Sequence, residues 1–344
     1  MKLAGILWCL ILCMACEGSQ IQKRDLSPIG YHPCPKEKQS VVFIAGFDQG
    51  DNTYYANARS YFKAQGVRVI DTLFSLQEIL LWLKQHYDDK VYDKIHIVSH
   101  SNAWRGMSLK TTPSGSRITL NSLKEALKAG EIPKLHKGIG KESKIIFHSC
   151  GLGENQELLQ ALKAAFTAEA PPQIYASVYF NVFGGKFAAH YLAKPYYGYY
   201  PTGESPGPLA LAKNFEAAYG TTHIDWLSAL RRRREGQQGM VYTYKFNIPV
   251  DWEFYFEDVS DIPVFRNRED IMDWLMTNDA MAEVLFQMGI PLEKYRWKSA
   301  VNKNTLTIKG KTTVLCVLEP ILSENDANEY RFPEIRDQKL YQIL

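Results

Sequence analysis

The chain has 344 residues, of which 46% are hydrophobic and 22% are charged, and its net charge is +3. This is ordinary globular composition, with enough length for a large core or for two domains. The small excess of positive charge does not indicate a nucleic-acid partner. The sequence shows no internal repeat and no low-complexity tract.

The start of the chain has the pattern of an export signal. A lysine precedes an apolar run over 3–15, and small residues follow that run. A basic start, a short apolar core and small residues at its end are typical of a secretion signal. The run is too short for a comfortable transmembrane helix. We therefore expect a signal peptide over 1–18 and an exported protein.

Ala15 is followed by Cys16 at the end of this run. The pair resembles a bacterial lipoprotein signal, in which a cysteine after a small residue becomes the lipidated N-terminus. The resemblance implies lipidation of Cys16 and anchoring of the protein to a membrane. Ordinary cleavage near Ala15 or Gly18, which gives a secreted protein, is the alternative. The polar, proline-containing stretch over 19–38 is expected to be a tether.

Apolar runs alternate with helical patterns from residue 40 to residue 182. Such a β-α-β series is typical of a mainly parallel sheet covered by helices. The segment after the third strand is expected to form two short strands, 107–111 and 117–120, around a turn at 113–115. The main strands are expected at 40–46, 67–71, 95–99, 144–147 and 174–182, and the helices at 54–65, 76–85, 122–128 and 155–168.

The rest of the chain is expected to complete this domain and to add a smaller one. A composition shift near residue 260 predicts an α/β domain over 39–260 and a small α+β segment over 261–344. Within them, the pattern predicts a long surface loop at 187–207, rich in tyrosine, glycine and proline. It also predicts helix at 214–234, 268–276 and 281–288, extended chain at 241–256, and strands at 305–308 and 313–318 around a turn at 309–311.

Three cysteines follow the signal, at positions 34, 150 and 316. An odd number at wide spacing is not a disulfide framework, although an exported protein would permit one. No CxxC pair occurs, so a thiolate metal site is not expected. No glycine-rich phosphate loop follows any strand. We therefore expect neither a metal nor a cofactor.

Two apolar strands end abruptly in reactive side chains. The run over 95–99 leads to His100, and the run over 144–147 leads to Cys150. In open α/β sheets, functional groups gather where parallel strands end. A cysteine attacks as thiolate, and a neighbouring imidazole can take its proton. The alternative is that Cys150 is a small buried hydrophobic residue, as free cysteines often are.

These segments, Val98-Ser99-His100-Ser101 and Phe147-His148-Ser149-Cys150-Gly151, resemble the caspases, metacaspases and related cysteine peptidases of clan CD. In that family an apolar strand ends in Ser-His-Gly, and a later one ends in Ala-Cys or Ser-Cys with glycine following. The resemblance covers about residues 38–185. It implies a caspase-like three-layer α/β/α sandwich and a Cys-His dyad that hydrolyses amide bonds in a protein or peptide substrate.

The resemblance also implies a role for each residue of the site. Cys150 is the nucleophile, His100 is the base, and the backbone N–H groups of Ser101 and Cys150 form the oxyanion hole. His148 stands where metacaspases have aspartate and caspases have glutamine, at a position that faces the specificity pocket. It is a candidate for lining that pocket or for tuning the thiol, and the alternative is a histidine packed at the strand end. Asp48, on the acidic loop after the first strand, is a candidate for binding a basic substrate side chain. Ser101 itself replaces the family's glycine.

Two other functions remain open from the sequence. The segment around Ser101 loosely matches the G-x-S-x-G nucleophile elbow of α/β-hydrolases, which would make Ser101 the nucleophile of a serine esterase or lipase. The elbow needs a strand-turn-helix context, whereas glycine and proline follow here before any helix. A non-catalytic binding domain with the caspase-like fold is the third hypothesis, because a fold does not fix a function.

Overall fold

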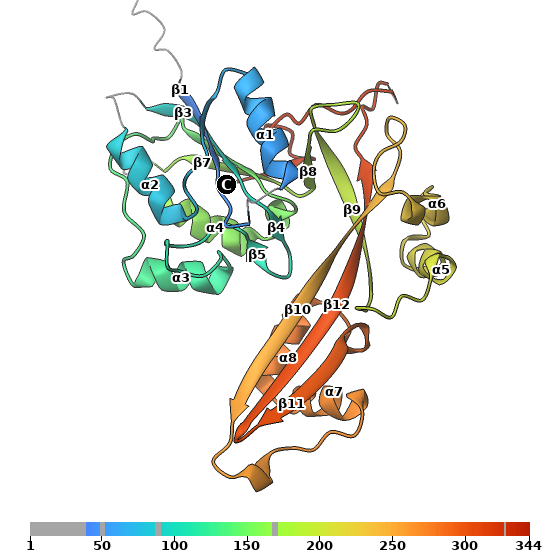
Figure 1. The fold of residues 1–344 in the computed structure, drawn as a ribbon. Helices are drawn as coiled ribbons and strands as arrows, with labels where there is room; N and C mark the ends of the chain where they lie inside the picture. The colour runs from blue at the N-terminus through green and yellow to red at the C-terminus, as the bar shows by residue number, and fades with distance from the viewer. Residues whose placement is uncertain (1–38, 49–51, 87–90, 167–170, 327) are drawn as a thin grey trace, which may run out of the picture. The chain divides into compact units, whose positions relative to one another are not determined.

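The computed structural model describes residues 39–344 except 49–51, 87–90, 167–170 and 327 (Figure 1). The expected signal peptide, the tether and Cys16 lie outside the described residues. Within the described ranges, no helix is both long enough and apolar enough to cross a membrane. The described chain is mixed α/β, with a partly parallel sheet, a large antiparallel sheet and a small two-stranded antiparallel sheet.

The partly parallel sheet has six strands in the order β13-β7-β6-β3-β1-β2. The pairings among β2, β1, β3, β6 and β7 are parallel, and β13 is antiparallel to β7. Non-consecutive parallel neighbours require crossover connections, which the intervening helices supply. The strands are β1 (Gln39–Ile44), β2 (Arg68–Ile70), β3 (Tyr92–Val98), β6 (Lys144–His148), β7 (Gln173–Ser177) and β13 (Tyr341–Ile343).

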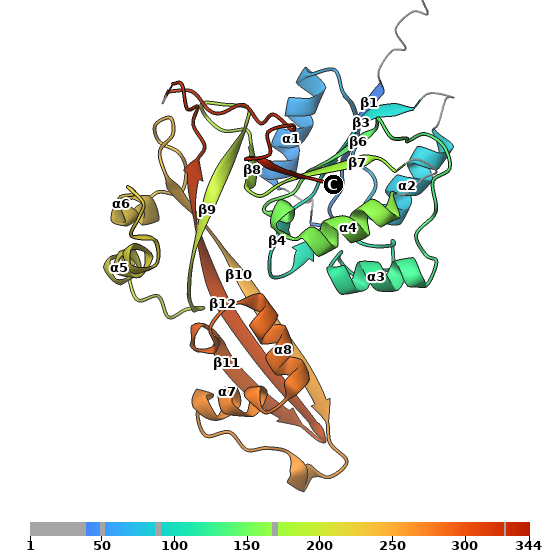
Figure 2. The same cartoon turned by 180° about the vertical axis from the view of Figure 1, so that it is seen from behind.

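Helices cover both faces of this sheet (Figures 1 and 2). Alternate residues of a strand point to opposite faces, and β1 shows this clearly. Val42 and Ile44 pack with α1 (Thr53–Ala64). Val41 and Phe43 belong to the larger core on the other face. The helices in that core are α2 (Leu76–Gln85), α3 (Leu120–Lys128) and α4 (Gln156–Ala165).

The antiparallel sheet has the order β10-β12-β9-β8, and β11 also pairs with β12. Helices α5 and α6 pack near the start of β10, and α7 and α8 pack toward its far end (Figure 2). The strands are β8 (Phe180–Phe183), β9 (His190–Pro201), β10 (Tyr242–Tyr255), β11 (Arg296–Asn302) and β12 (Thr305–Pro320). The helices are α5 (Pro208–Tyr219), α6 (Trp226–Arg231), α7 (Arg268–Met276) and α8 (Asp279–Met288).

The two short strands expected at 107–111 and 117–120 do not form. Of this segment only Gly106–Met107 is a strand, Lys110 and Arg117 make an isolated bridge, and α3 begins at Leu120.

Three further sequence expectations differ from this arrangement. The segment at 187–207 is not a surface loop, because most of it forms β9. Gly198 lies inside β9, where a Cβ atom would come within 2.6 Å of the Phe215 ring, so this glycine makes room for α5. The expected strand at 174–182 is two strands, β7 and β8, which belong to different sheets.

The third difference is at 309–311, where a turn was expected and β12 continues without a break. Lys309 and Lys311 are exposed and Gly310 is buried, so the alternation of a strand continues through this segment. At Gly310 a Cβ atom would lie 2.4 Å from the Trp297 ring, which explains a glycine inside a strand. β12 pairs with β9 and with β10, so the antiparallel sheet crosses the expected boundary at residue 260.

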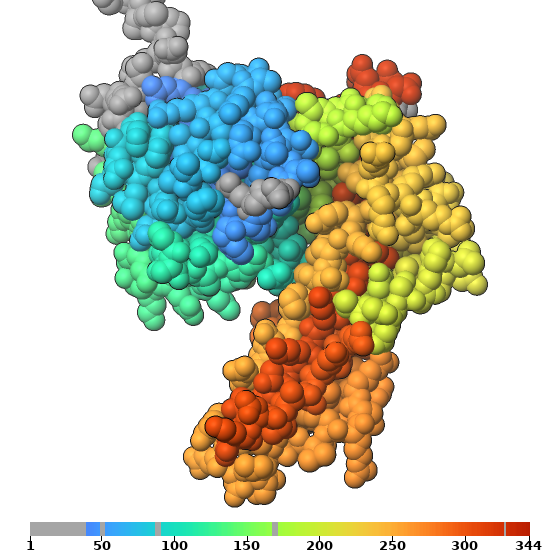
Figure 3. Space-filling view, in the orientation of Figure 1, coloured from blue at the N-terminus to red at the C-terminus, as the bar shows by residue number. Residues whose placement is uncertain are grey.

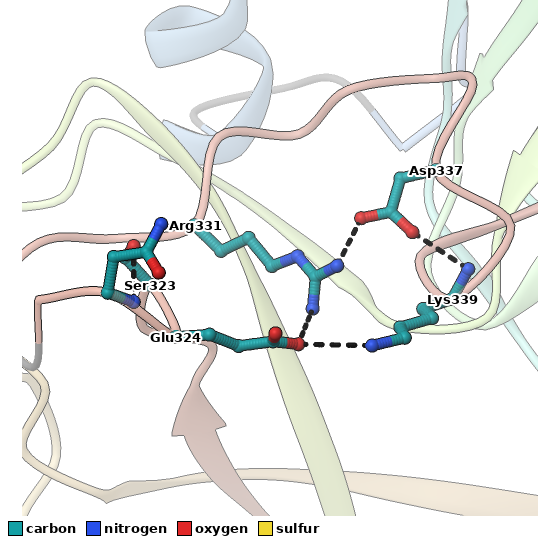
Figure 4. Close-up of polar contacts among 6 residues, drawn as sticks. Ser323, Glu324, Arg331, Asp337 and Lys339 are labelled. Atoms are coloured by element: carbon teal, nitrogen blue, oxygen red, sulfur yellow. Dashed lines mark hydrogen bonds and ion pairs between the residues drawn. The ribbon is translucent and has the colours of Figure 1, made fainter.

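An ion-pair network holds the segment that leads from β12 to β13 (Figure 4). The Arg331 guanidinium contacts the carboxylates of Glu324 and Asp337. The Lys339 ammonium lies 3.2 Å from the same Glu324 carboxylate. Arg331 and Lys339 also line a cavity of about 390 Å³ beside the end of β12. The network therefore joins residues near both ends of the segment between β12 and β13.

Gly153 provides a test of how tightly the chain after β6 is packed. It lies in the short helix η1 (Leu152–Glu154), where a Cβ atom would be 2.6 Å from the Ala176 carbonyl oxygen and 2.8 Å from the Val178 nitrogen. Because backbone atoms cannot move aside easily, Gly153→Ala is expected to destabilise the fold by about 1–3 kcal/mol. At Gly140 the nearest atom to a new Cβ is 3.8 Å away, so Gly140→Ala is the control. Urea unfolding of both variants measures the difference, and equal stabilities would contradict the packing described here.

Candidate functional site

The pairing of β3 with β6 brings the two strand ends together. Val98 is the register partner of His148. His100 and Cys150 each follow two residues later, at the carboxyl ends of adjacent parallel strands. The register therefore places both residues at the same edge of the sheet, where Tyr54 of α1 is near both of them.

Tyr54, in the first turn of α1, contacts both strand ends. Its ring stacks on the His100 imidazole with 4.4 Å between ring centroids. Its hydroxyl donates a hydrogen bond of 2.7 Å to the backbone carbonyl of His148. Burial raises the pKa of Tyr54 well above its usual value, and the nearby Cys150 raises it further. The start of α1 therefore lies over the site as a neutral, hydrogen-bonded aromatic side chain.

His100 is held by a chain of hydrogen bonds that ends at Asp48. The backbone N–H of His100 donates to the Tyr55 hydroxyl at 3.0 Å, and that hydroxyl donates to Asp48 Oδ1 at 2.8 Å. The Ser108 hydroxyl donates to Asp48 Oδ2, also at 2.8 Å. Burial lowers the pKa of His100, and the Asp48 charge opposes this. Asp48, expected in a substrate pocket, is exposed but uses both carboxylate oxygens to fix the His100 segment.

The Cys150 thiol is buried under the antiparallel sheet. Its Sγ lies 3.9 Å from the Asn181 carbonyl oxygen. Burial raises the pKa of Cys150 to about 12, so the thiol is protonated at neutral pH. Among the described residues, no hydrogen bond joins this thiol to the His100 ring. The apolar cluster around Cys150 includes Phe180, Tyr191, Ala193, Tyr242, Cys316 and Leu318.

The Ser101 side chain joins the two strand ends. Its hydroxyl donates a hydrogen bond of 2.6 Å to the backbone carbonyl of Cys150. Ser101 begins the short β4 (Ser101–Asn102), which pairs with β5 (Gly106–Met107). The Ser101 hydroxyl is therefore bonded to a carbonyl and not to a histidine, which is the partner that a nucleophilic serine needs.

The turn between β4 and β5 is attached to the antiparallel sheet. The Trp104 ring packs edge-on against Tyr197, with 5.0 Å between centroids, and lies 5.7 Å from the Phe246 ring. The space-filling view shows this part of the chain against the strands of the antiparallel sheet (Figure 3). The sheet that covers Cys150 therefore also contacts the segment that follows His100.

His148 is packed inside the protein. It is only 5% exposed, so it does not line an open pocket in this structure. Its Nε2 lies 2.9 Å from His96 Nδ1, and its ring is within 5.7 Å of the rings of Phe62, Phe183 and His190. Burial lowers the pKa of His148 to about 4, although the Asn181 side chain acts in the opposite direction.

His96 and His190 complete this cluster. Burial holds the pKa of each well below its ordinary value, and His148 lowers both further. Within the described ranges, no group of three or more histidine, cysteine or acidic side chains is arranged to hold a metal ion. Because burial lowers the pKa of all three imidazoles, these histidines are neutral at pH 7 and pack under α1.

Sequence reasoning did not select Asn52, Tyr54, Tyr55 or Asn181. Asn52 had a usable signal, because asparagine directly before a predicted helix is a strong N-cap candidate. The N-cap role is present: Asn52 Oδ1 accepts a hydrogen bond from Tyr54 N at 3.0 Å. Its contact with His100 joins residues 48 positions apart and has no local sequence signal. Comparison with models of known protein families and with curated proteins finds no match.

Proposed function

We propose that this chain is an exported cysteine peptidase of caspase-like architecture, with Cys150 as nucleophile and His100 as base. The observation that carries the proposal is the β3–β6 register, which leads both residues to the same edge of the sheet. Helices on both faces of the partly parallel sheet support a three-layer α/β/α sandwich. The proposed substrate is an amide bond in a protein or peptide.

In the proposed reaction His100 takes the proton of the Cys150 thiol, and the thiolate sulfur attacks the substrate carbonyl carbon. The carbonyl oxygen becomes an oxyanion, which the backbone N–H groups of Ser101 and Cys150 stabilise. The C–N bond breaks, and His100 gives its proton to the leaving amine. Water then hydrolyses the thioester and restores the thiol.

The described conformation is the resting form in this proposal. With a pKa of about 12, only ~10⁻⁵ of the Cys150 thiol is ionised at pH 7. Residues of β8, β9, β10 and β12 cover the thiol. Reaction therefore requires that this cover shifts and lets substrate and solvent reach the sulfur. The contact of Trp104 with Tyr197 and Phe246 couples such a shift to the His100 segment.

The same burial favours one other candidate function. A thiol that stays covered and protonated suits a non-catalytic binding domain, in which Cys150 is a core residue. The Ser101 esterase hypothesis gains no such support, because the Ser101 hydroxyl bonds to the Cys150 carbonyl. The peptidase and the binding domain therefore differ in one property: in the peptidase the Cys150 thiol becomes exposed and ionised.

Covalent trapping tests the proposal. We expect a panel of peptides that end in an electrophilic ketone to form a thioether at Cys150, located by mass spectrometry after digestion. Cys316 is the internal control, because it is buried in the same cluster and its pKa is also raised by burial. Adducts at Cys150 that are absent from Cys316 support the nucleophile. Adducts at neither cysteine, with both thiols alkylated after unfolding, favour the binding domain.

A further inference from the structure

The Asn52 side-chain amide is fixed at both ends. Its Oδ1 accepts the Tyr54 backbone N–H at 3.0 Å, as an N-cap does, and its Nδ2 lies 2.8 Å from His100 Nε2. The N-cap hydrogen bond places Asn52 Oδ1 next to the Tyr54 N–H. The Asn52 amide nitrogen must therefore face the His100 ring. An amide nitrogen only donates. His100 Nε2 is therefore the acceptor, and the imidazole proton is on Nδ1.

The surroundings of His100 keep the ring in this orientation. Tyr54 stacks on one face, and the Tyr55 ring lies edge-on at 4.8 Å between centroids. Asp48 is the charged group that acts on the imidazole, through its position beside Tyr55. Tyr54 and Tyr55 are themselves neutral, because burial raises the pKa of both phenols. The hydrogen bond from Asn52 therefore selects the tautomer within a fixed ring plane.

This tautomer leaves His100 without a free lone pair. Its Nδ1 carries the proton, and its Nε2 lone pair accepts from Asn52. We propose that Asn52 is a positioning residue that holds His100 in a form unable to accept a proton. Rotation of the Asn52 amide by half a turn then releases it. The effect of Asn52 on catalysis rests on the proposed function, whereas its effect on the His100 tautomer does not.

The rotation has a defined consequence at the start of α1. With Oδ1 turned toward His100, the amide oxygen accepts a hydrogen bond from Nε2–H in the other tautomer, and the Nδ1 lone pair becomes free. The same movement removes the acceptor from the Tyr54 N–H and weakens the cap of α1. Because Tyr54 also stacks on His100 and bonds to the His148 carbonyl, the first turn of α1 and the basicity of His100 change together.

The Asn52→Asp variant separates the helix-capping role of Asn52 from its control of the His100 tautomer. A carboxylate can accept from the Tyr54 N–H and from His100 Nε2–H at the same time, so it keeps the cap and removes the constraint on the tautomer. We expect His100 to change from the Nδ1–H to the Nε2–H tautomer and to bind protons at least about tenfold more tightly, because the carboxylate stabilises the imidazolium. Asn52→Ser is the matched control, since serine caps a helix well but is too short to hold the imidazole.

The measurement is NMR of the full chain with ¹⁵N-labelled histidine, titrated over pH, with the His100 signals assigned from a His100→Gln variant. Wild-type protein in the Nδ1–H form and N52D in the Nε2–H form support the inference. Wild-type His100 in the Nε2–H form overturns it, and this result needs no variant to fold. So does N52D with the wild-type tautomer and proton affinity.

Peptide cleavage is measured in an experiment separate from the NMR titration. If a peptide is cleaved, N52D should move the acidic limb of the pH–rate profile to higher pH by about one unit or more. N52S also removes the contact with His100 but adds no charge, so it should move the limb by less. An unmoved acidic limb in an N52D protein whose NMR tautomer has changed would overturn the catalytic part of the inference. A changed tautomer with no cleavage by any variant supports the Asn52 inference and removes the peptidase proposal.

Discussion

Cys150→Ala is expected to abolish peptide cleavage, and His100→Ala is expected to lower kcat/KM by about 10²–10⁴-fold. The first effect follows because the proposed thioester forms at the Cys150 sulfur. The second follows from the usual contribution of a positioned acid–base group. Both side chains lie at the ends of β3 and β6 and not in the large apolar core, so both variants should remain folded. Turnover of a cleavable peptide found by library screening is the measurement, with circular dichroism to check the fold.

Two further variants decide between the functions. Cys316→Ala removes the other thiol of the same cluster and should keep full turnover. Ser101→Ala should lower turnover only mildly, because the proposed mechanism uses the backbone N–H of residue 101. Loss of activity in Ser101→Ala, with activity kept in Cys150→Ala, would establish the serine esterase instead. If no peptide or ester is cleaved and all the variants bind a partner like wild type, the enzyme hypothesis fails.

The strands and helices of the parallel sheet were predictable because the pattern that indicates each one lies within its own short segment of sequence. Each buried strand is a short apolar run, and each helix has its own periodicity and capping residues. Helix α2 begins and ends where its pattern predicts, at residues 76 and 85. The ends of β3 and β6 were equally visible, because His100 and Cys150 interrupt apolar runs. Adjacent pairing of β3 and β6 agrees with the usual preference of consecutive parallel strands, although β2 and β3 depart from it because β1 lies between them.

The antiparallel sheet was less predictable because its glycines and tyrosines contact residues that lie far away in the sequence. Gly198 makes room for Phe215, and Gly310 makes room for Trp297, yet glycine in a sequence favours a turn. The cover over Cys150 comes from residues such as Tyr242 and Leu318, far along the chain. No local pattern reveals such contacts, so the sequence offered burial of the thiol only as an alternative and gave no indication of its raised pKa.

The same limit applies to the hydrogen bonds of the site. The bond from Ser101 to Cys150 spans 49 positions, and the chain from His100 through Tyr55 to Asp48 joins three separate segments. The residue types identified the candidate site residues. Their hydrogen-bond partners depend on the register of β3 with β6 and on the position of α1. As a result, each residue of the proposed dyad is bonded to another group in the described conformation: the His100 ring to Asn52 and the Cys150 thiol to the Asn181 carbonyl.

Acidification is expected to destabilise the fold strongly between pH 6.5 and pH 4, because the histidine cluster under α1 must stay neutral. The pKa of His148 is about 4 in the folded chain, and an unfolded histidine titrates near 6.5. The unfolded state therefore binds more protons in this window, so stability is complete above it and is lost as the pH falls. His148 alone accounts for about 3 kcal/mol at about 1.4 kcal/mol per pH unit. His96 and His190 act in the same direction, since burial lowers the pKa of both.

Urea unfolding at several pH values, for wild type and two histidine variants, tests this. His148→Gln should lower stability at pH 7.5, because Gln does not fill the space among Phe62, Phe183 and His190. It should also make the loss between pH 6.5 and pH 4 less steep by about 1.4 kcal/mol per pH unit, because one proton fewer is taken up on unfolding. His223→Gln, at an exposed position, should keep the wild-type slope. Equal slopes in wild type and His148→Gln would mean that the folded chain accepts a proton at this cluster, and the neutral packing under α1 would be wrong.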